Sequence, residues 1–297
     1  MKYTMPVAAA LLAALMLSGC GPKNEPQPIQ STPSASASVS QASSSAGDVS
    51  LPGTAEPSAD PPEARDPKPV EPPTQDPEQL LSIVEQADWT WFDDAVMIGD
   101  SVSLKLKNFV TAQRQINPEF FGTAQFLTSG SLGSGNALWE VSDKSVHPSF
   151  QGEKMLLEES IPKTGAKKVY MMLGVNDVAV YGIEGAIENY GTLLDQIQQA
   201  APDVEFYIQS ATPICEGDEV GALNNENLVL YNQALEEMCQ ERGIHFIDVA
   251  AVLKGEDGYL PREYCSDPDG MGIHLTDVAC KLWLGYLCED ARVMQGL

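Results

Sequence analysis

The stretch Val96-Met97-Ile98-Gly99-Asp100-Ser101-Val102 decides the fold that we expect for this chain. An apolar run ends at Gly99, and residues 102–113 read as a helix. A serine placed where a buried strand passes into a helix is held on rigid backbone. It also faces the unpaired N–H groups of the helix, which favour negative charge. Ser101 is therefore a candidate nucleophile, although the stretch alone favours the simpler interpretation that Ser101 caps the helix.

Strands and helices alternate along the rest of the chain. Apolar runs predict five strands, at residues 95–98, 124–128, 168–173, 204–209 and 244–249. Apolar residues at helical spacing predict further helices, at residues 183–199, 225–242 and 276–293. Strands separated by helices indicate a parallel sheet covered on both faces. We therefore expect a three-layer α/β/α sandwich with a central sheet of about five strands, similar to flavodoxin.

Polar residues follow the predicted strands and should meet at one edge of the sheet. In open α/β sheets the site lies beyond the carboxyl ends of the strands. The segments at these ends are Gly99-Asp100-Ser101, Ser129–Gly133, Gly174-Val175-Asn176-Asp177 and Gly272-Ile273-His274-Leu275-Thr276. Serine, glycine, asparagine and histidine are thus expected on one rim.

These blocks, in this order, resemble the SGNH (GDSL-type) hydrolase family over essentially residues 93–297. The resemblance implies that Ser101 is a nucleophile and His274 its general base. It also implies an oxyanion hole made by the N–H of Ser101, the Asn176 side chain and a glycine, for which Gly130 is preferred and Gly133 is the rival. A serine hydroxyl needs a base to remove its proton, and imidazole suits neutral pH. The oxyanion needs preorganised donors.

The sequence departs from the family pattern just before the histidine. The family usually carries an aspartate three residues upstream, where this chain has Met271. We expect Asp269 to orient His274, with Asp267 as the second choice. A Ser–His dyad oriented by a backbone carbonyl is the third.

A long excursion, residues 134–150, leaves the predicted rim after the second strand. It contains Trp139 and His147, and long loops at an active rim commonly form lids or substrate walls. We therefore expect substrate specificity to reside there. Tyr181 and Glu216, on other loops, are further candidates.

The first 77 residues read as a targeting segment and a tether. Residues 1–20 resemble a bacterial lipoprotein signal peptide that ends in the lipobox Leu17-Ser18-Gly19-Cys20. The resemblance implies a lipid on Cys20 and a location at the cell membrane, facing the extracytoplasmic side. Residues 21–77 are rich in Ser, Pro and acidic residues, which predicts a disordered tether before a hydrolase domain at residues 78–297.

Charge and cysteine usage limit the classes of partner. The chain carries 42 acidic against 17 basic residues, a net charge of −25, which argues against nucleic acid as a partner. No cluster at zinc spacing is present, and we expect neither a metal nor a cofactor. Beyond Cys20 there are five cysteines, so not all can pair within the chain. The pair we consider is Cys215 with Cys265. We expect a monomer.

The expected function is hydrolysis of short acyl esters of the acetyl type, on a small molecule, a carbohydrate or a cell-envelope polymer. The resemblance carries this expectation. An acyltransferase on the same site is an alternative, because some relatives transfer acyl groups. A glycan-binding surface lipoprotein without catalysis is another, and the presence of both Ser101 and His274 argues against it. A metal-dependent phosphatase would need a carboxylate cluster at a spacing that the chain does not show.

Overall fold

The computed structural model describes residues 72–297. The expected signal peptide, Cys20 and residues 21–71 of the expected tether lie outside the described residues. The first described helix, α1 (Pro77–Gln86), begins beside the expected domain boundary. Its N-cap is Asp76, whose side chain accepts hydrogen bonds from the N–H groups of Glu78 and Gln79.

A sheet of five parallel strands forms the centre of the molecule. Along the chain these are β1 (Ala95–Gly99), β2 (Gln125–Thr128), β5 (Lys168–Met172), β6 (Glu205–Gln209) and β7 (His245–Ile247). They lie side by side in the order β2-β1-β5-β6-β7. Within the register, Gly99 of β1 lies opposite Thr128 of β2 and Met172 of β5. The strands therefore end close together, and all five strand predictions are confirmed.

Alternate residues of the central strands pack into two separate cores. In β1, Met97 belongs to one core, whereas Val96 and Ile98 belong to the other. In β5, Tyr170 and Met171 divide in the same way. A parallel sheet buried on both faces reads as a continuous apolar run, which is why β1 and β5 are recognisable in the sequence.

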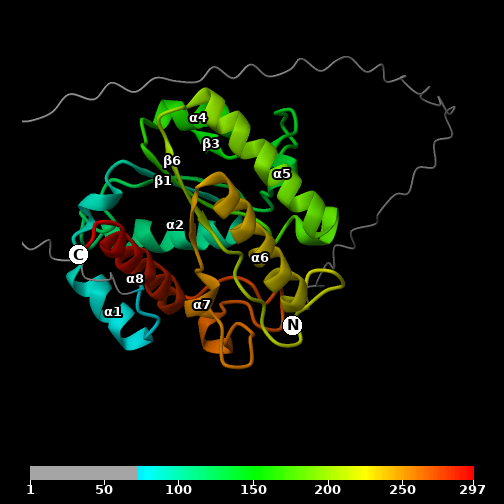
Figure 1. Cartoon of the computed structure of the whole chain (residues 1–297). Coiled ribbons are helices and arrows are strands. Elements are labelled where there is room, and N and C mark those ends of the chain that lie inside the picture. The colour runs from blue at the N-terminus through cyan, green and yellow to red at the C-terminus, as the bar shows by residue number, and fades with distance from the viewer. Residues whose placement is uncertain (1–71) are drawn as a thin grey trace, which may run out of the picture. The chain divides into compact units, whose positions relative to one another are not determined.

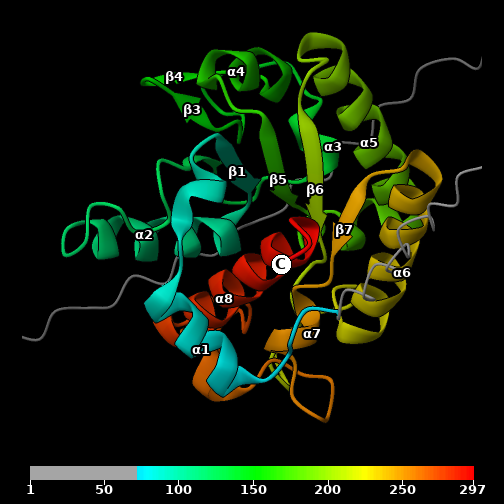
Figure 2. The same ribbon diagram turned by 60° about the vertical axis from the view of Figure 1, so that its left-hand side comes forward.

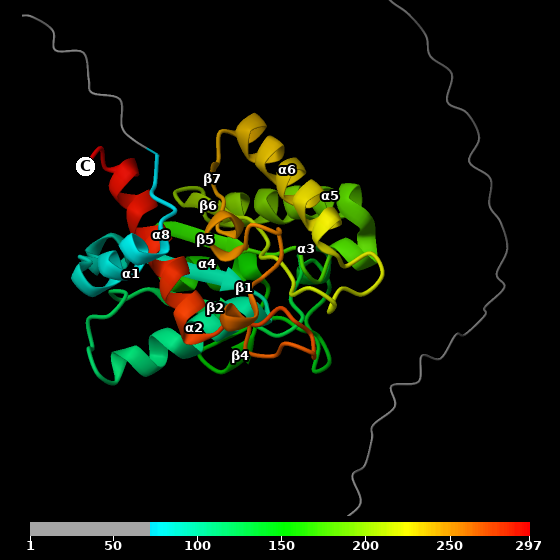
Figure 3. The same cartoon turned by 90° about the horizontal axis from the view of Figure 1, so that it is seen from below.

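Helices cover both faces, and the predicted three-layer α/β/α sandwich is confirmed (Figures 1 and 3). One face carries α1, α2 (Ser101–Arg114), α7 (Ala250–Leu253) and α8 (Asp277–Met294). The other carries α3 (Ser134–Ala137), α4 (Leu157–Thr164), α5 (Val178–Ala200) and α6 (Asn225–Arg242). The remaining elements are two short 3₁₀ helices, Trp89–Phe92 and Arg262–Tyr264, and a hairpin of β3 (Ser149–Phe150) and β4 (Glu153–Lys154). The hairpin lies next to α4 in Figure 2.

Helix α8 packs deeply within its layer. Leu282, Trp283 and Leu284 are all buried, and Trp283 Nε1 donates a 2.7 Å hydrogen bond to Gln209 Oε1 of β6. On its other side, a Cβ atom at Gly285 would collide with the carbonyl oxygen of Leu80 in α1. The missing side chain thus allows α1 to lie directly against α8. Among residues 72–297, no helix has the length and apolar character required to cross a bilayer.

Candidate active site

Ser101 lies at the β1–α2 corner, which we define as residues 99–102. It is half-buried and is the first residue of α2. Asp100, not Ser101, is the N-cap, because Asp100 Oδ1 accepts a 2.8 Å hydrogen bond from the N–H of Val102. The simpler interpretation of Ser101 as a helix cap is therefore wrong. With the cap supplied by its neighbour, the hydroxyl of Ser101 has no structural task in the helix.

Glycine at position 99 is required by the tight packing of the corner. A Cβ atom there would collide with the Ser103 side chain and approach the backbone oxygen of Met172 to 2.7 Å. The Met172 oxygen belongs to the neighbouring strand and cannot move aside without disturbing the sheet. The packing therefore holds the backbone of the corner in one position.

Asp100 is a buried carboxyl group next to the expected nucleophile. Its exposed fraction is 1%, and burial raises its pKa to about 6. The N–H groups of Val102 and Ser103 counteract this shift. The carboxyl group of Asp177 raises the pKa further, and the proximity of His274 lowers it.

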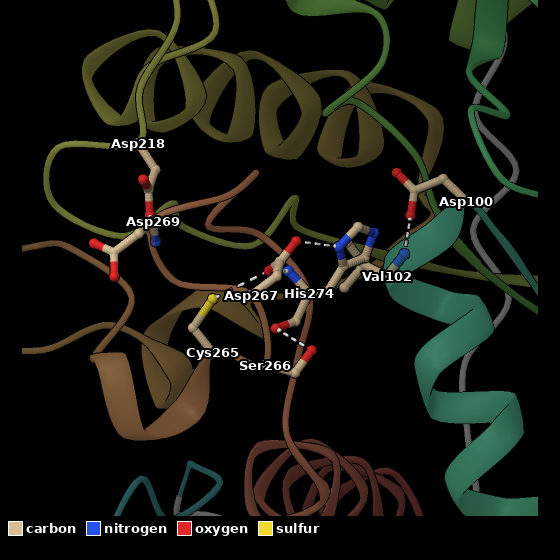
Figure 4. Close-up of polar contacts among 8 residues, drawn as sticks. All are labelled: Asp100, Val102, Asp218, Cys265, Ser266, Asp267, Asp269 and His274. Atoms are coloured by element: carbon tan, nitrogen blue, oxygen red, sulfur yellow. Dashed lines mark hydrogen bonds and ion pairs between the residues drawn. The ribbon is translucent and has the colours of Figure 1, made fainter. Parts of the chain in front are cut away.

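His274 is oriented by Asp267. The imidazole Nδ1 lies 2.7 Å from Asp267 Oδ2, and the backbone N–H of His274 donates to Oδ1 at 3.1 Å. Burial raises the pKa of Asp267, but these bonds, with one from Cys265, outweigh it and lower the pKa overall. The carboxylate therefore accepts the Nδ1 proton, which leaves Nε2 of neutral His274 free to accept another. Figure 4 shows the ring between Asp267 and the first turn of α2, at Asp100 and Val102.

The expectation that Asp269 orients His274 is wrong. The side chain of Asp269 is 78% exposed and binds Arg262 Nη2 at 2.6 Å. Its backbone N–H donates to Asp218, and its φ of 68° places it in the left-handed region. The side chain thus lies away from the imidazole, as Figure 4 shows.

Pairing at the base of the loop explains why Asp267 is selected. We call residues 265–276 the His274 loop. Its two ends pair like a hairpin: Cys265 bridges Leu275, and the N–H of Ser266 donates to the carbonyl of His274 at 2.7 Å. Asp267 directly follows this base and lies beside His274, whereas Asp269 lies nearer the tip.

Asn176 reaches the β1–α2 corner from the loop after β5. Its side-chain amide Nδ2 donates to Asp100 Oδ2 at 3.2 Å and to the carbonyl of Leu132 at 3.1 Å. The structure therefore brings Asn176, Asp100 and the loop after β2 into contact. One amide group links three of the four blocks that the sequence placed on one rim.

The two candidate glycines after β2 differ in their surroundings. The N–H of Gly133 donates to Asn136 Oδ1 at 2.9 Å, and a Cβ atom there would lie within 3 Å of the Asp177 carboxyl group. Within residues 72–297, the N–H groups of Gly130 and Ser101 have no acceptor, and Gly130 is exposed. Gly130 therefore offers a free donor, and Gly133 serves loop packing.

Asp177 holds the loop after β2, a role that sequence reasoning missed. This buried carboxyl group accepts hydrogen bonds from the N–H of Ser134 at 2.9 Å and from that of Gly135 at 3.0 Å. Burial raises the pKa of Asp177, and these bonds oppose the shift. Its position directly after Asn176 was the available signal, because a polar residue at the end of a buried strand needs partners there.

The excursion after β2 is ordered by internal contacts. His147 is buried, and its Nε2 lies 3.1 Å from the carbonyl of Ala137, which ties the excursion to the end of α3. The ring of Tyr181 packs against Gly135, where it fills the space of a side chain. Trp139 is 56% exposed next to α3. The excursion is thus held in place by these contacts and exposes the Trp139 side chain to solvent.

Other sequence expectations have the following outcomes. Cys215 and Cys265 are both free thiols and do not form the disulfide that we considered. In the described part of the chain, no three His, Cys, Asp or Glu side chains gather in an arrangement suited to a metal ion. Ser101 Oγ makes no hydrogen bond with another described residue.

Comparison with known proteins gives a match to one family. Residues 141–281 match the profile of the GDSL-like Lipase/Acylhydrolase family. This segment includes Asn176, Asp267 and His274, and Ser101 precedes it. No match was found among curated proteins.

Solved structures with a similar arrangement come from several bacteria. A Streptococcus pneumonia protein, provisionally described as a platelet activating factor, is 18% identical with a TM-score of 0.48, covering 72% of this chain and 90% of that one. A GDSL-like lipase from Bacteroides thetaiotaomicron is 13% identical with a TM-score of 0.49, covering 75% and 99%. A carbohydrate acetylesterase family member from Sinorhizobium meliloti is 15% identical with a TM-score of 0.46, covering 69% and 100%. Residues 141–281, slightly less than half of the chain, are thus similar to the GDSL-like lipase/acylhydrolase family.

Proposed function

We propose that the protein is a serine esterase in which Ser101, His274 and Asp267 act as nucleophile, general base and orienting carboxylate. The observation that carries this proposal is the 2.7 Å bond between His274 Nδ1 and Asp267. It fixes the tautomer that leaves Nε2 able to accept a proton, on a ring that lies near the start of α2. Ser101 is the hydroxyl at that point.

The proposed reaction proceeds in two halves. Ser101 Oγ attacks the carbonyl carbon of the ester while Nε2 of His274 takes its proton, and the imidazolium then protonates the leaving alcohol. A water molecule, activated in the same way, releases the acid from the acyl-enzyme. The developing oxyanion accepts hydrogen bonds from the unpartnered N–H groups of Ser101 and Gly130 and from the Asn176 side-chain amide. To donate to the oxyanion, the amide gives up one of its present acceptors, Asp100 or Leu132.

The proposed substrates are short acyl esters of the acetyl type, on carbohydrate or cell-envelope polymers. The resemblance of the Gly-Asp-Ser, Gly-x-Asn-Asp and His-Leu-Thr blocks supports this substrate class. We further propose that a lipid on Cys20 anchors the enzyme at the extracytoplasmic side of the cell membrane, which the lipobox Leu17–Cys20 supports. Such an anchor would keep the enzyme near esters of the envelope.

The test is turnover of p-nitrophenyl acetate by the wild type and by Ser101→Ala. Removing the nucleophile should reduce kcat by about 10⁴-fold or more, with an unchanged circular dichroism spectrum. A fluorophosphonate probe followed by peptide mass spectrometry should label Ser101 in the wild type. Equal turnover by the two proteins, or a label on another residue, would contradict the assignment.

A further inference from the structure

Two thiols lie behind the Asp267–His274 pair. Cys265 Sγ is 3.3 Å from Asp267 Oδ1, on the carboxylate whose other oxygen binds the imidazole (Figure 4). Cys215 contacts the thiol of Cys265, and both residues are buried. The backbone also joins the two segments, because the N–H of Cys215 donates to the carbonyl of Gly272 at 2.9 Å.

Cys265 has one proton and two neighbouring acceptors. Burial raises the pKa of Cys215 and raises that of Cys265 to about 12, so both groups are thiols at neutral pH. A carboxylate oxygen is a stronger acceptor than a sulfur atom. The proton of Cys265 therefore points to Asp267 Oδ1, 3.3 Å from the sulfur.

This bond affects the rotation of the carboxylate. Oδ1 of Asp267 receives two donors, the N–H of His274 and the thiol of Cys265, and Oδ2 receives the imidazole. If Oδ1 lost one of its donors, the carboxylate would be freer to rotate. Oδ2 would then spend less time in line with Nδ1, and the imidazole would lose its alignment.

We propose that Cys265 is a positioning residue whose thiol fixes the Asp267 carboxylate against His274, and that a disulfide between Cys265 and Cys215 abolishes this role. The inference rests on the proposed function, since it concerns how the general base is held. It adds a residue to the site and a covalent state in which the site is impaired.

The oxidation proceeds by thiol–disulfide exchange with a small disulfide such as oxidised glutathione. One cysteine, as its thiolate, attacks the glutathione disulfide and releases one glutathione thiolate. The second cysteine then attacks the mixed disulfide, forms the Cys215–Cys265 bond and releases the second glutathione. Two protein thiols are oxidised, one small disulfide is reduced, and the two protons pass to the departing thiolates. Because both thiols are buried and protonated, the exchange should be slow.

The first experiment compares ester hydrolysis by reduced variants of the full chain. Cys265→Ala removes the donor and should lower kcat roughly fivefold with KM unchanged, the effect of losing one ordinary hydrogen bond. Cys265→Ser keeps a donor and should recover most of that loss. Cys215→Ser is the matched control and should behave like the wild type. A Cys265→Ala variant with wild-type kcat, or a Cys265→Ser variant no better than Cys265→Ala, would overturn the positioning role.

The second experiment needs no substitution at Cys265, so a misfolded variant cannot obscure it. Wild type incubated with oxidised glutathione should lose activity in step with the loss of two alkylatable thiols, and dithiothreitol should restore both. Cys215→Ser should keep its activity. Failure to form the disulfide, or a disulfide without loss of activity, would contradict the oxidised state. If the wild type does not hydrolyse esters, the proposed function itself is wrong. If the wild type is active but substitution of Cys265 has no effect, only the role of Cys265 is wrong.

Discussion

The β1–α2 corner and the His274 loop hold the two proposed reacting side chains by different means. The corner is buried and set by backbone packing, with Asp100 1% exposed and Gly99 against the neighbouring strand. The His274 loop has an exposed tip, where Asp269 and Met271 lie, and Asp267 holds its histidine through side-chain bonds. The sheet thus fixes the position of Ser101, whereas a single carboxylate fixes the orientation of His274. Changes in the loop should impair activity, and changes in the corner should impair stability.

Asp267→Asn removes the carboxylate that orients His274 and should have the largest effect on activity. An amide can present an N–H to Nδ1 and favour the wrong tautomer, so kcat should fall about 10³-fold with little change in Tm. Asp269→Asn, in the same loop, is the control and should stay near the wild-type rate, because its surface ion pair with Arg262 contributes little. Initial rates on p-nitrophenyl acetate measure both. Similar losses in the two variants would show that the loop acts through its overall structure.

Gly99→Ala tests the β1–α2 corner and should lower the stability of the protein. The added methyl group meets Ser103 and the backbone oxygen of Met172, so the free energy of unfolding should fall by about 1–3 kcal/mol. Urea unfolding measures the change. Gly130→Ala is the control, because the added methyl group meets no atom within 4 Å and the variant should be as stable as the wild type. Gly165 is unsuitable as a control because its φ is positive. An unfolding midpoint unchanged in Gly99→Ala would show that the corner can relax.

The buried carboxyl group of Asp100 gives a third expected effect, on the pH dependence of stability. Because burial raises the folded-state pKa of Asp100 from its ordinary value of 3.8 to about 6, the folded state binds this proton more tightly than the unfolded chain does. The resulting stability is present below pH 3.8 and is lost as the pH rises through about 6.

Asp100→Asn should therefore lose less stability than the wild type between pH 4 and pH 7.5. The difference between the two proteins should be about 3 kcal/mol at most. Denaturant unfolding at both pH values measures it, and Asp203→Asn, at an exposed turn, serves as the control. An identical pH dependence in Asp100→Asn and the wild type would show that Asp100 does not titrate in this range.

The sheet and the positions of Ser101, Asn176 and His274 could be predicted because buried parallel strands produce apolar runs and end at one edge. The orienting aspartate could not be predicted. Its choice depends on the pairing of Cys265 and Ser266 with Leu275 and His274, which leaves no periodic pattern in the sequence. Spacing alone favoured Asp269, and the turn of the loop carried that residue to the surface.

Short elements were also missed, for local reasons. Helix α1 follows a proline-rich segment, and α4 is brief and contains Pro162, so neither shows a long apolar period. Helix α5 begins before the predicted residues 183–199. A break at Gly182, with φ 69° and ψ 179°, separates its first turn from the periodic part. Periodicity detects the straight portion of such a helix and misses the turn before it.

The contact of α1 with α8 has a consequence for biogenesis. These helices are the first and last of the described domain, and Gly285 lets Leu80 lie directly against α8. A chain emerging from the ribosome exposes the apolar face of α1 before α8 exists to cover it. The domain can close only after α8 has been synthesised. Chaperones that hold unfolded chains should therefore recognise Leu80 and Val84 during this interval.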